Sequence, residues 1–78
     1  MNAPSYIMLL TLFLTEGGTL EAEQDTTATS MEECREEARR QSEALREEFA
    51  LTTRERGLCP FRDVKIRCER RKHPRQEP

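Results

Sequence analysis

The stretch Tyr-Ile-Met-Leu-Leu-Thr-Leu-Phe-Leu, residues 6–14, is the only long apolar run in a chain of 78 residues, of which 36% are charged. A helix needs roughly 17 to 25 apolar residues to span a bilayer, so this run is too short to cross a membrane. A short apolar run that is followed by turn-forming residues is typical of a buried strand. We therefore predict that residues 6–14 form the central strand of a small sheet.

The length and composition of the chain predict one small domain with a limited core. A chain of this size buries only about 60% of the surface that its unfolded form exposes. Hydrophobic residues make up 35% of the chain and tryptophan is absent, so the core must come from the apolar run and one helical stripe. We assign residues 1–69 to the domain and residues 70–78 to a flexible basic tail.

The residues after the apolar run predict a β-hairpin. The glycine pair at residues 17–18 tolerates positive φ, and residues 19–23 can return as a second strand. With a three-residue loop at residues 16–18, Leu14 lies opposite Leu20 and the inner face carries no charge, whereas a two-residue loop would set the leucines beside glutamates. We prefer the three-residue loop, whose inner face consists of Met8, Leu10, Leu12, Leu14, Leu20 and Ala22.

A capping box predicts where the helix begins. The Ser30 hydroxyl can accept from the Glu33 amide, while the Glu33 carboxylate reaches back to the Ser30 amide. We expect the helix to begin at Met31 and to end between Ala50 and Gly57, since glycine commonly terminates helices. Residues spaced three and four apart form its buried stripe, which consists of Met31, Cys34, Ala38, Gln41, Leu45 and Phe49.

Residues 64–69 alternate apolar and charged side chains with period two, which is typical of a half-buried strand. Pro60 keeps residues 58–61 out of a central strand, and we assign them to a turn. The inward side chains of the strand would be Val64, Ile66 and Cys68.

The order strand, strand, helix, strand has one preferred arrangement. A right-handed crossover through the helix lays the third strand parallel to the second. The third strand then pairs with the free side of the apolar strand and runs antiparallel to it. We predict an α+β fold of ββαβ topology, with an antiparallel-type three-stranded sheet in the order 2-1-3 and one long helix packed on one face.

The apolar strand has hydrophobic side chains on both faces, and one helix can cover only one of them. The uncovered face would show Ile7, Leu9 and Phe13 between acidic side chains along one edge and basic side chains along the other. An exposed apolar patch bordered by charge is typical of an association surface. We predict contact there with a protein target or with a second copy in a homodimer. In the alternative, Tyr6, the tail and the turn at residues 58–61 fold over this face.

Charge is distributed unevenly along the chain. Residues 1–50 carry eleven acidic and four basic residues, and residues 51–78 carry four acidic and nine basic ones. The basic segment could contact phosphates, but no aromatic residue is interleaved in it to stack on bases. Protein contact is therefore the main prediction, with nucleic-acid binding as an alternative. The candidate binding residues are Ile7, Leu9, Phe13, Glu21, Glu23, Lys65, Arg67, Arg70, Arg71 and Lys72.

No pattern in the sequence predicts a catalytic, cofactor or metal site, and we expect a protein without enzymatic activity. Cys34, Cys59 and Cys68 lack the spacing of zinc ligands. Cys68 in a strand cannot hold a hydrogen bond to His73 in a tail. Three cysteines allow three different single disulfides, and their odd number favours a reduced cytosolic protein over a disulfide scaffold.

A cleaved secretory signal is the alternative to this architecture. Residues 1–22 contain an apolar core followed by small residues, but no lysine or arginine precedes that core. Removal of this segment would leave one helix and one short strand with almost no core. We therefore expect a cytoplasmic protein that retains the segment, and a secreted or periplasmic protein is the second choice.

The succession of motifs resembles a class of short uncharacterised proteins of phages and prophages. The shared features are an apolar first strand, a Gly-Gly turn, a Ser-Met-Glu-Glu-Cys helix start and a cysteine on the last strand. The class includes small inhibitors of bacterial defence such as anti-CRISPR proteins. The resemblance implies a non-enzymatic binding module in the bacterial host cytoplasm, which blocks a surface on a host defence complex, for example a ribonucleoprotein.

The resemblance also implies that the helix cysteine and the last-strand cysteine, Cys34 and Cys68, lie close together. The predicted topology agrees, because the helix begins and the last strand ends at the same end of the domain. A disulfide requires Cα atoms within about 7 Å of each other. Cys59 would lie at the other end, roughly 30 Å away for a helix of twenty residues, and remain a free thiol.

Overall fold

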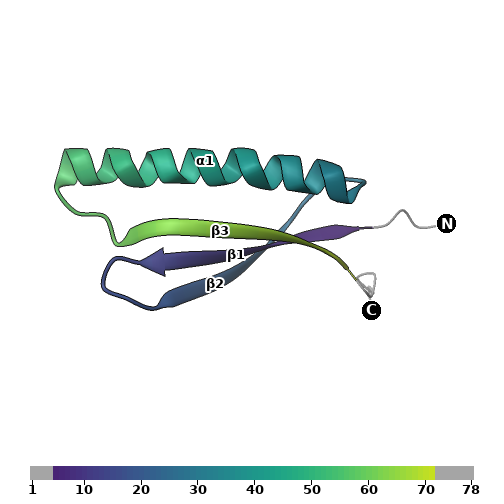
Figure 1. Cartoon of the computed structure of the whole chain (residues 1–78), viewed down its shortest axis with the longest axis horizontal. Coiled ribbons are helices and arrows are strands. Elements are labelled where there is room, and N and C mark those ends of the chain that lie inside the picture. The colour runs from purple at the N-terminus through teal and green to yellow at the C-terminus, as the bar shows by residue number, and fades with distance from the viewer. Residues whose placement is uncertain (1–4, 72–78) are drawn as a thin grey trace.

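The computed structural model describes residues 5–71 and contains three strands and one helix. They are β1 (Tyr6–Leu14), β2 (Thr19–Asp25), α1 (Met31–Arg56) and β3 (Phe61–Arg70). The strand order is β2-β1-β3, and β1 is antiparallel to both neighbours. The helix runs along one face of the sheet (Figure 1). The predicted α+β class, ββαβ topology and strand order are confirmed.

The central position of β1 follows from its composition. Its backbone groups are paired on both sides, and its even-numbered side chains point toward the helix. Met8 is fully buried and Leu10 is 8% exposed, and complete burial of one such side chain contributes about 1.5 to 3 kcal/mol. The buried cluster beneath the helix consists of Met8, Leu10, Ala28, Cys34 and Ala38.

The hairpin register differs from the predicted one by two residues. Leu12, and not Leu14, lies opposite Leu20. The loop of three residues lies one position earlier, at residues 15–17, and is closed by a hydrogen bond of 3.1 Å from the Leu14 amide to the Gly18 carbonyl. Both glycines of the pair have positive φ, 111° and 84°. A shift of two preserves which side chains share a face, so the predicted inner-face set is unchanged.

The helix begins and ends where its caps place it. The Ser30 hydroxyl accepts from the Glu33 amide at 3.1 Å. Gly57 follows the last turn with a φ of 78°, and its amide donates to the Thr53 carbonyl at 2.8 Å. One predicted bond is wrong: the Glu33 carboxylate accepts from the amide of Thr29 at 2.9 Å and from its hydroxyl at 3.2 Å, because these two donors lie together.

The helix lies over β3 and β1 and leaves β2 uncovered. No Cα atom of α1 is within 8 Å of a Cα atom of β2. All seven residues of β2 are exposed, including Leu20 at 49%. A side-chain hydrogen bond of 2.7 Å from Gln41 to Gln24 links the helix to this strand. Our expectation that the helix would cover the whole inner face is therefore wrong at β2.

The third strand is longer than predicted at both ends. It begins at Phe61, the last residue of the predicted turn. Phe61 can belong to the strand because Pro60 stands just before the strand and not inside it. The Phe61 ring packs on Phe49 of the helix, with centroids 5.5 Å apart. At the other end Arg70, which we had assigned to the tail, is the last residue of β3.

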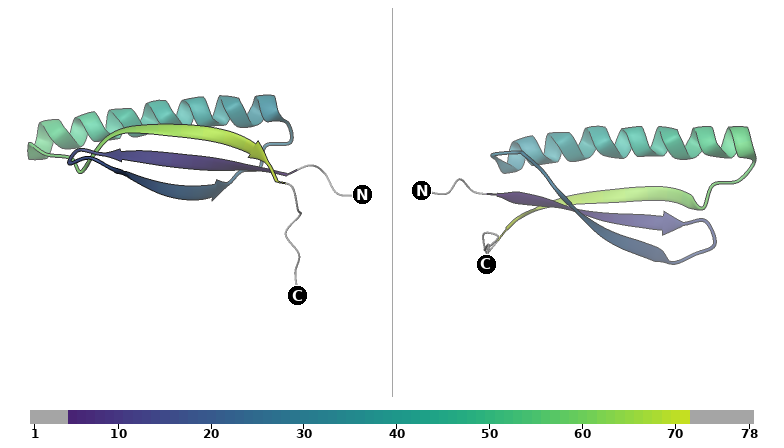
Figure 2. Two further views of the ribbon diagram at one scale, coloured as in Figure 1. Left: turned by 60° about the horizontal axis from the view of Figure 1, so that its bottom comes forward. Right: turned by 180° about the vertical axis from the view of Figure 1, so that it is seen from behind.

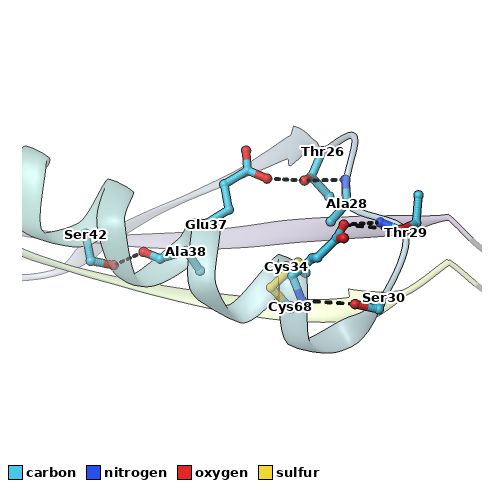
Figure 3. Close-up of a disulfide and its surroundings, with 10 residues drawn as sticks. Thr26, Ala28, Thr29, Ser30, Cys34, Glu37, Ala38, Ser42 and Cys68 are labelled. Atoms are coloured by element: carbon cyan, nitrogen blue, oxygen red, sulfur yellow. Dashed lines mark hydrogen bonds between the residues drawn. A yellow bond between two sulfur atoms is a disulfide. The ribbon is translucent and has the colours of Figure 1, made fainter.

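A disulfide joins the first turn of α1 to the end of β3. The Cα atoms of Cys34 and Cys68 are 6.1 Å apart and the two sulfur atoms are bonded, as Figure 3 shows. Cys59, in the turn between α1 and β3, is buried and free. The predicted pairing is confirmed. Closing a loop of 34 residues stabilises the fold by about 4 kcal/mol on chain-entropy grounds.

Candidate protein-interaction surface

The face of the sheet opposite α1 carries alternate side chains from all three strands, and we call it the outer face. Directly opposed residues on neighbouring strands share a face, so the register defines its rows. Leu9 lies between Glu23 of β2 and Arg67 of β3. Thr11 lies in the same way between Glu21 and Lys65. The centre of the face consists of Ile7, Leu9, Thr11 and Phe13.

No other element of the described chain covers the outer face. Figure 2 shows α1 on one side of the sheet only. Tyr6 packs against the buried cluster beneath the helix, Phe61 contacts a ring of the helix, and Leu58 remains 67% exposed. For residues 5–71, the alternative in which Tyr6 and the turn fold over this face is therefore wrong.

Charged and polar side chains of the neighbouring strands partly cover the central side chains of the outer face, which are half-buried. The Arg62 guanidinium lies 5.4 Å from the centroid of the Phe13 ring. The Thr11 hydroxyl donates to the Glu21 carboxylate at 3.2 Å. Long charged side chains commonly cover apolar surface in this way while their charged ends stay in water. The outer face is thus an apolar strip with charged borders.

The two borders have opposite charge at the rows of Leu9 and Thr11. We call Glu21 and Glu23 the acidic edge, and Lys65 and Arg67 the basic edge. The edges lie on strands separated by β1, at about 4.8 Å per strand, and no ion pair joins them among residues 5–71. Arg67 forms an ion pair of 3.8 Å with Glu69 of its own strand, and both side chains remain about half exposed. The edge charges are therefore accessible to complementary charges on another molecule.

Two of the three basic residues predicted beyond these edges, Arg70 and Arg71, are described by the structure. Arg70 lies opposite Tyr6 and so belongs to the helix side of the sheet. Arg71 donates to the Asp25 carboxylate at 2.5 Å, and its amide donates to the Ser5 carbonyl at 2.9 Å. Lys72 lies outside the described residues. Arg70 and Arg71 form no continuous basic patch with Lys65 and Arg67, because Glu69 lies between them, and we base no nucleic-acid site on them.

A second feature, at the turn between α1 and β3, is a cleft of about 580 Å³. Arg46 donates to the Asp63 carboxylate at 2.9 Å and to the Val64 carbonyl at 3.0 Å, so its charge is already paired. The hydrogen bond from Arg46, together with the Val64 amide, lowers the pKa of Asp63 below its ordinary value of 3.8. The cleft is lined by Thr15, Arg46, Phe49, Ala50, Thr53, Gly57, Leu58, Cys59, Phe61, Arg62 and Asp63.

The cleft and the rest of the described chain show no arrangement for metal chemistry. Within residues 5–71, no group of three or more histidine, cysteine, aspartate or glutamate side chains is placed to hold a metal ion. No helix in that range is long and apolar enough to cross a membrane.

Sequence reasoning missed the contact between Arg62 and Phe13. It depends on a β-bulge, because Phe13 pairs with Asp63 while Leu14 pairs with Phe61, which leaves Arg62 as an extra residue. The spacing of the apolar residues contained a signal for it. Phe61 and Val64 both face the helix although they are three residues apart, and only an inserted residue reconciles that spacing with the period of two.

Comparison with known proteins gives no match to a family model, to a curated protein or to a solved structure. The resemblance to small phage proteins therefore stays a prediction. The candidate surface is defined by its own geometry, which consists of an apolar strip between an acidic edge and a basic edge.

Proposed function

We propose that this protein is a non-enzymatic binding module whose outer face occupies a surface on a partner protein. The observation that carries the proposal is an apolar strip on the central strand that no described element covers. Folding needs β1 to be apolar on the helix side only, so Ile7, Leu9 and Phe13 require another explanation. Apolar patches bordered by charge are typical of protein interfaces, which combine an apolar centre with a polar rim.

The charged edges would decide how a partner is oriented. A partner must present cationic groups to Glu21 and Glu23, and anionic groups to Lys65 and Arg67. Turning the partner by 180° in the plane of the interface would bring like charges together, which costs several kcal/mol. The surface is built on paired strands. A preformed surface loses less conformational entropy when it binds a partner. Such a module acts by steric occlusion and needs no chemistry of its own.

The resemblance to phage proteins supplies the class of target. We infer an inhibitor, encoded by a mobile element, of a bacterial defence complex in the host cytoplasm, including defence complexes built on RNA. The module would inhibit the complex by blocking access of its substrate.

The test measures phage plating on bacteria that carry an active defence system and express the protein. The parent protein should raise plating efficiency. Leu9→Asp, on the outer face, should abolish the gain, because truncation of a central interface residue costs about 2 kcal/mol or more. Leu51→Asp is the matched control, since Leu51 is 45% exposed on α1. Loss of inhibition in the Leu51 variant alone, or no gain with the parent against any defence system, would contradict the proposal.

The disulfide favours a second candidate, a secreted or periplasmic protein. Disulfides such as Cys34–Cys68 persist mainly in oxidising compartments. The two candidates differ in the mass of the intact protein purified from its native host. A mature form that begins near residue 22 would lack β1, the strand on which both sheet contacts depend.

A further inference from the structure

The charges of the outer face have a symmetry that identifies one partner. The two central rows each place a glutamate on one side of β1 and a cation on the other. Glu23 and Arg67 flank Leu9, and Glu21 and Lys65 flank Thr11. The row of Ile7 lies between two acids, Asp25 and Glu69, which are already paired with Arg71 and Arg67. The acidic edge lies wholly on β2 and the basic edge wholly on β3. A rotation that exchanges the positions of β2 and β3 therefore exchanges the signs of the charges.

Two copies can stack face to face about two simple twofold axes that lie between the sheets. An axis perpendicular to the strands sets β2 on β2, which brings the acidic edges together and the basic edges together. An axis parallel to β1 sets β2 of one copy on β3 of the other and keeps each row at its own height. Glu23 then faces Arg67 of the second copy, and Glu21 faces Lys65 of the second copy. Face-to-face sheets pack about 10 Å apart, a gap that these side chains can bridge.

We propose that the protein forms a symmetric dimer through its outer face, with the twofold axis parallel to β1. A twofold interface uses the same patch on both copies and must be self-complementary, which is the property that the two central rows possess. The central strips of the two copies would form the core of the interface. Thr11 lies within this core, and its hydroxyl is already bonded to Glu21 at 3.2 Å. It therefore brings no unpaired donor into the interface.

The size of the face predicts a weak dimer. Three strands of about nine residues cover roughly 30 Å by 14 Å on each copy, and the total for two copies lies below the roughly 1,200 Å² of standard interfaces, in the range of weak encounters. We therefore expect a dissociation constant in the micromolar range, and dissociation that is favoured by salt because the rim ion pairs are screened. This inference rests on the proposed function in using the same surface. The second copy would compete with any other partner.

Sedimentation analysis of the purified full chain, from about 1 to 500 μM, tests the proposal by charge reversal. Glu23→Arg and Arg67→Glu each place two pairs of like charges in the dimer and should weaken it about tenfold or more, since 1.4 kcal/mol corresponds to a factor of ten. The double variant with both changes restores opposite charges in both pairs and should dimerise to within about threefold of the parent. Arg40→Glu, an exposed cation of α1, is the matched control and should dimerise like the parent.

Circular dichroism confirms that each variant is folded before it is scored. If the axis were perpendicular to the strands, a reversed residue would face the same residue of the second copy or another residue of its own edge. Either single reversal would then leave association unchanged or strengthen it, and that result would overturn the proposal. A parent that stays monomeric throughout the range would also overturn it. Neither outcome decides the plating test, which scores inhibition by the parent separately, so the dimer can fail while the proposed function stands.

Discussion

The two faces of β1 differ in what they contact, although their composition is similar. On the helix side, Met8 is fully buried and Leu10 nearly so. On the outer side, Ile7 and Leu9 contact no helix, and their neighbours in each row are charged. A strand that served folding alone would be polar on its uncovered face, as half-buried strands commonly are. The comparison separates the apolar residues that the fold requires from those that it does not.

The two edge strands show the same division within the sheet. β3 lies beneath α1 and is joined to it by the disulfide, whereas β2 is exposed along its whole length. Leu20 points to the helix side and is still 49% exposed. Burial is therefore decided by the position of the helix and not by the alternation of side chains alone.

The largest expected effect is the loss of folding when a charge enters the helix side of β1. Met8→Asp places an unpaired carboxylate at a position with no exposure, at a cost of several kcal/mol. Small domains have little more than about 5 kcal/mol to lose. We expect the variant to lack a cooperative thermal transition. Met8→Leu, which conserves volume, should cost less than about 1.5 kcal/mol; a cooperative Met8→Asp variant would contradict this assignment.

Reduction of the disulfide should produce the next largest effect. It should lower the stability of the fold without changing the outer face. Opening the Cys34–Cys68 link should lower the free energy of unfolding by about 4 kcal/mol. Self-association under folding conditions should not change, because neither cysteine lies on the outer face. Urea titration with and without reductant measures the difference. Cys59→Ala should respond to reductant as the parent does, since Cys59 is free; a loss of that response would mean that Cys59 belongs to the bridge.

The smallest expected effect is a dependence of stability on pH that arises from the ion pair between Arg46 of α1 and Asp63 of β3. The hydrogen bond from Arg46 lowers the pKa of Asp63 in the folded protein below its ordinary 3.8. The stabilisation is therefore present above that value and is lost as the pH falls through the folded pKa. Because both side chains are about half exposed, the effect should be small. Urea titrations between about pH 5 and 2.5 should show a shallower decline for Asp63→Asn than for the parent; equal slopes would contradict this.

Much of the fold was predictable from the sequence because local signals and topology agreed. The caps at Ser30 and Gly57 determined the limits of the helix. The preference for right-handed crossovers and the apolar character of β1 predicted the strand order, and that order brings Cys34 and Cys68 to one end of the domain. The outer-face rows of charge around Leu9 followed from the alternation of side chains.

The remaining details depend on choices that the pattern does not distinguish. Hairpin loops at residues 15–17 and 16–18 both keep the same side chains inward, so the register could not be chosen from hydrophobicity. The sideways position of α1 depends on tertiary contacts such as that between Phe49 and Phe61. The contact of Arg62 with Phe13 depends on the bulge, which no local propensity specifies.

The most direct test of the central claim is the stability of Leu9→Asp, measured by urea titration at a concentration where the parent is monomeric. The substitution is the same as at Met8 and lies one residue along the strand, on the outer face. We predict a folded protein that loses about 1 kcal/mol, which is the span of strand propensities, and that no longer self-associates at high concentration. A loss as large as that of Met8→Asp would mean that both faces of β1 belong to the core of a single molecule, and would contradict the account.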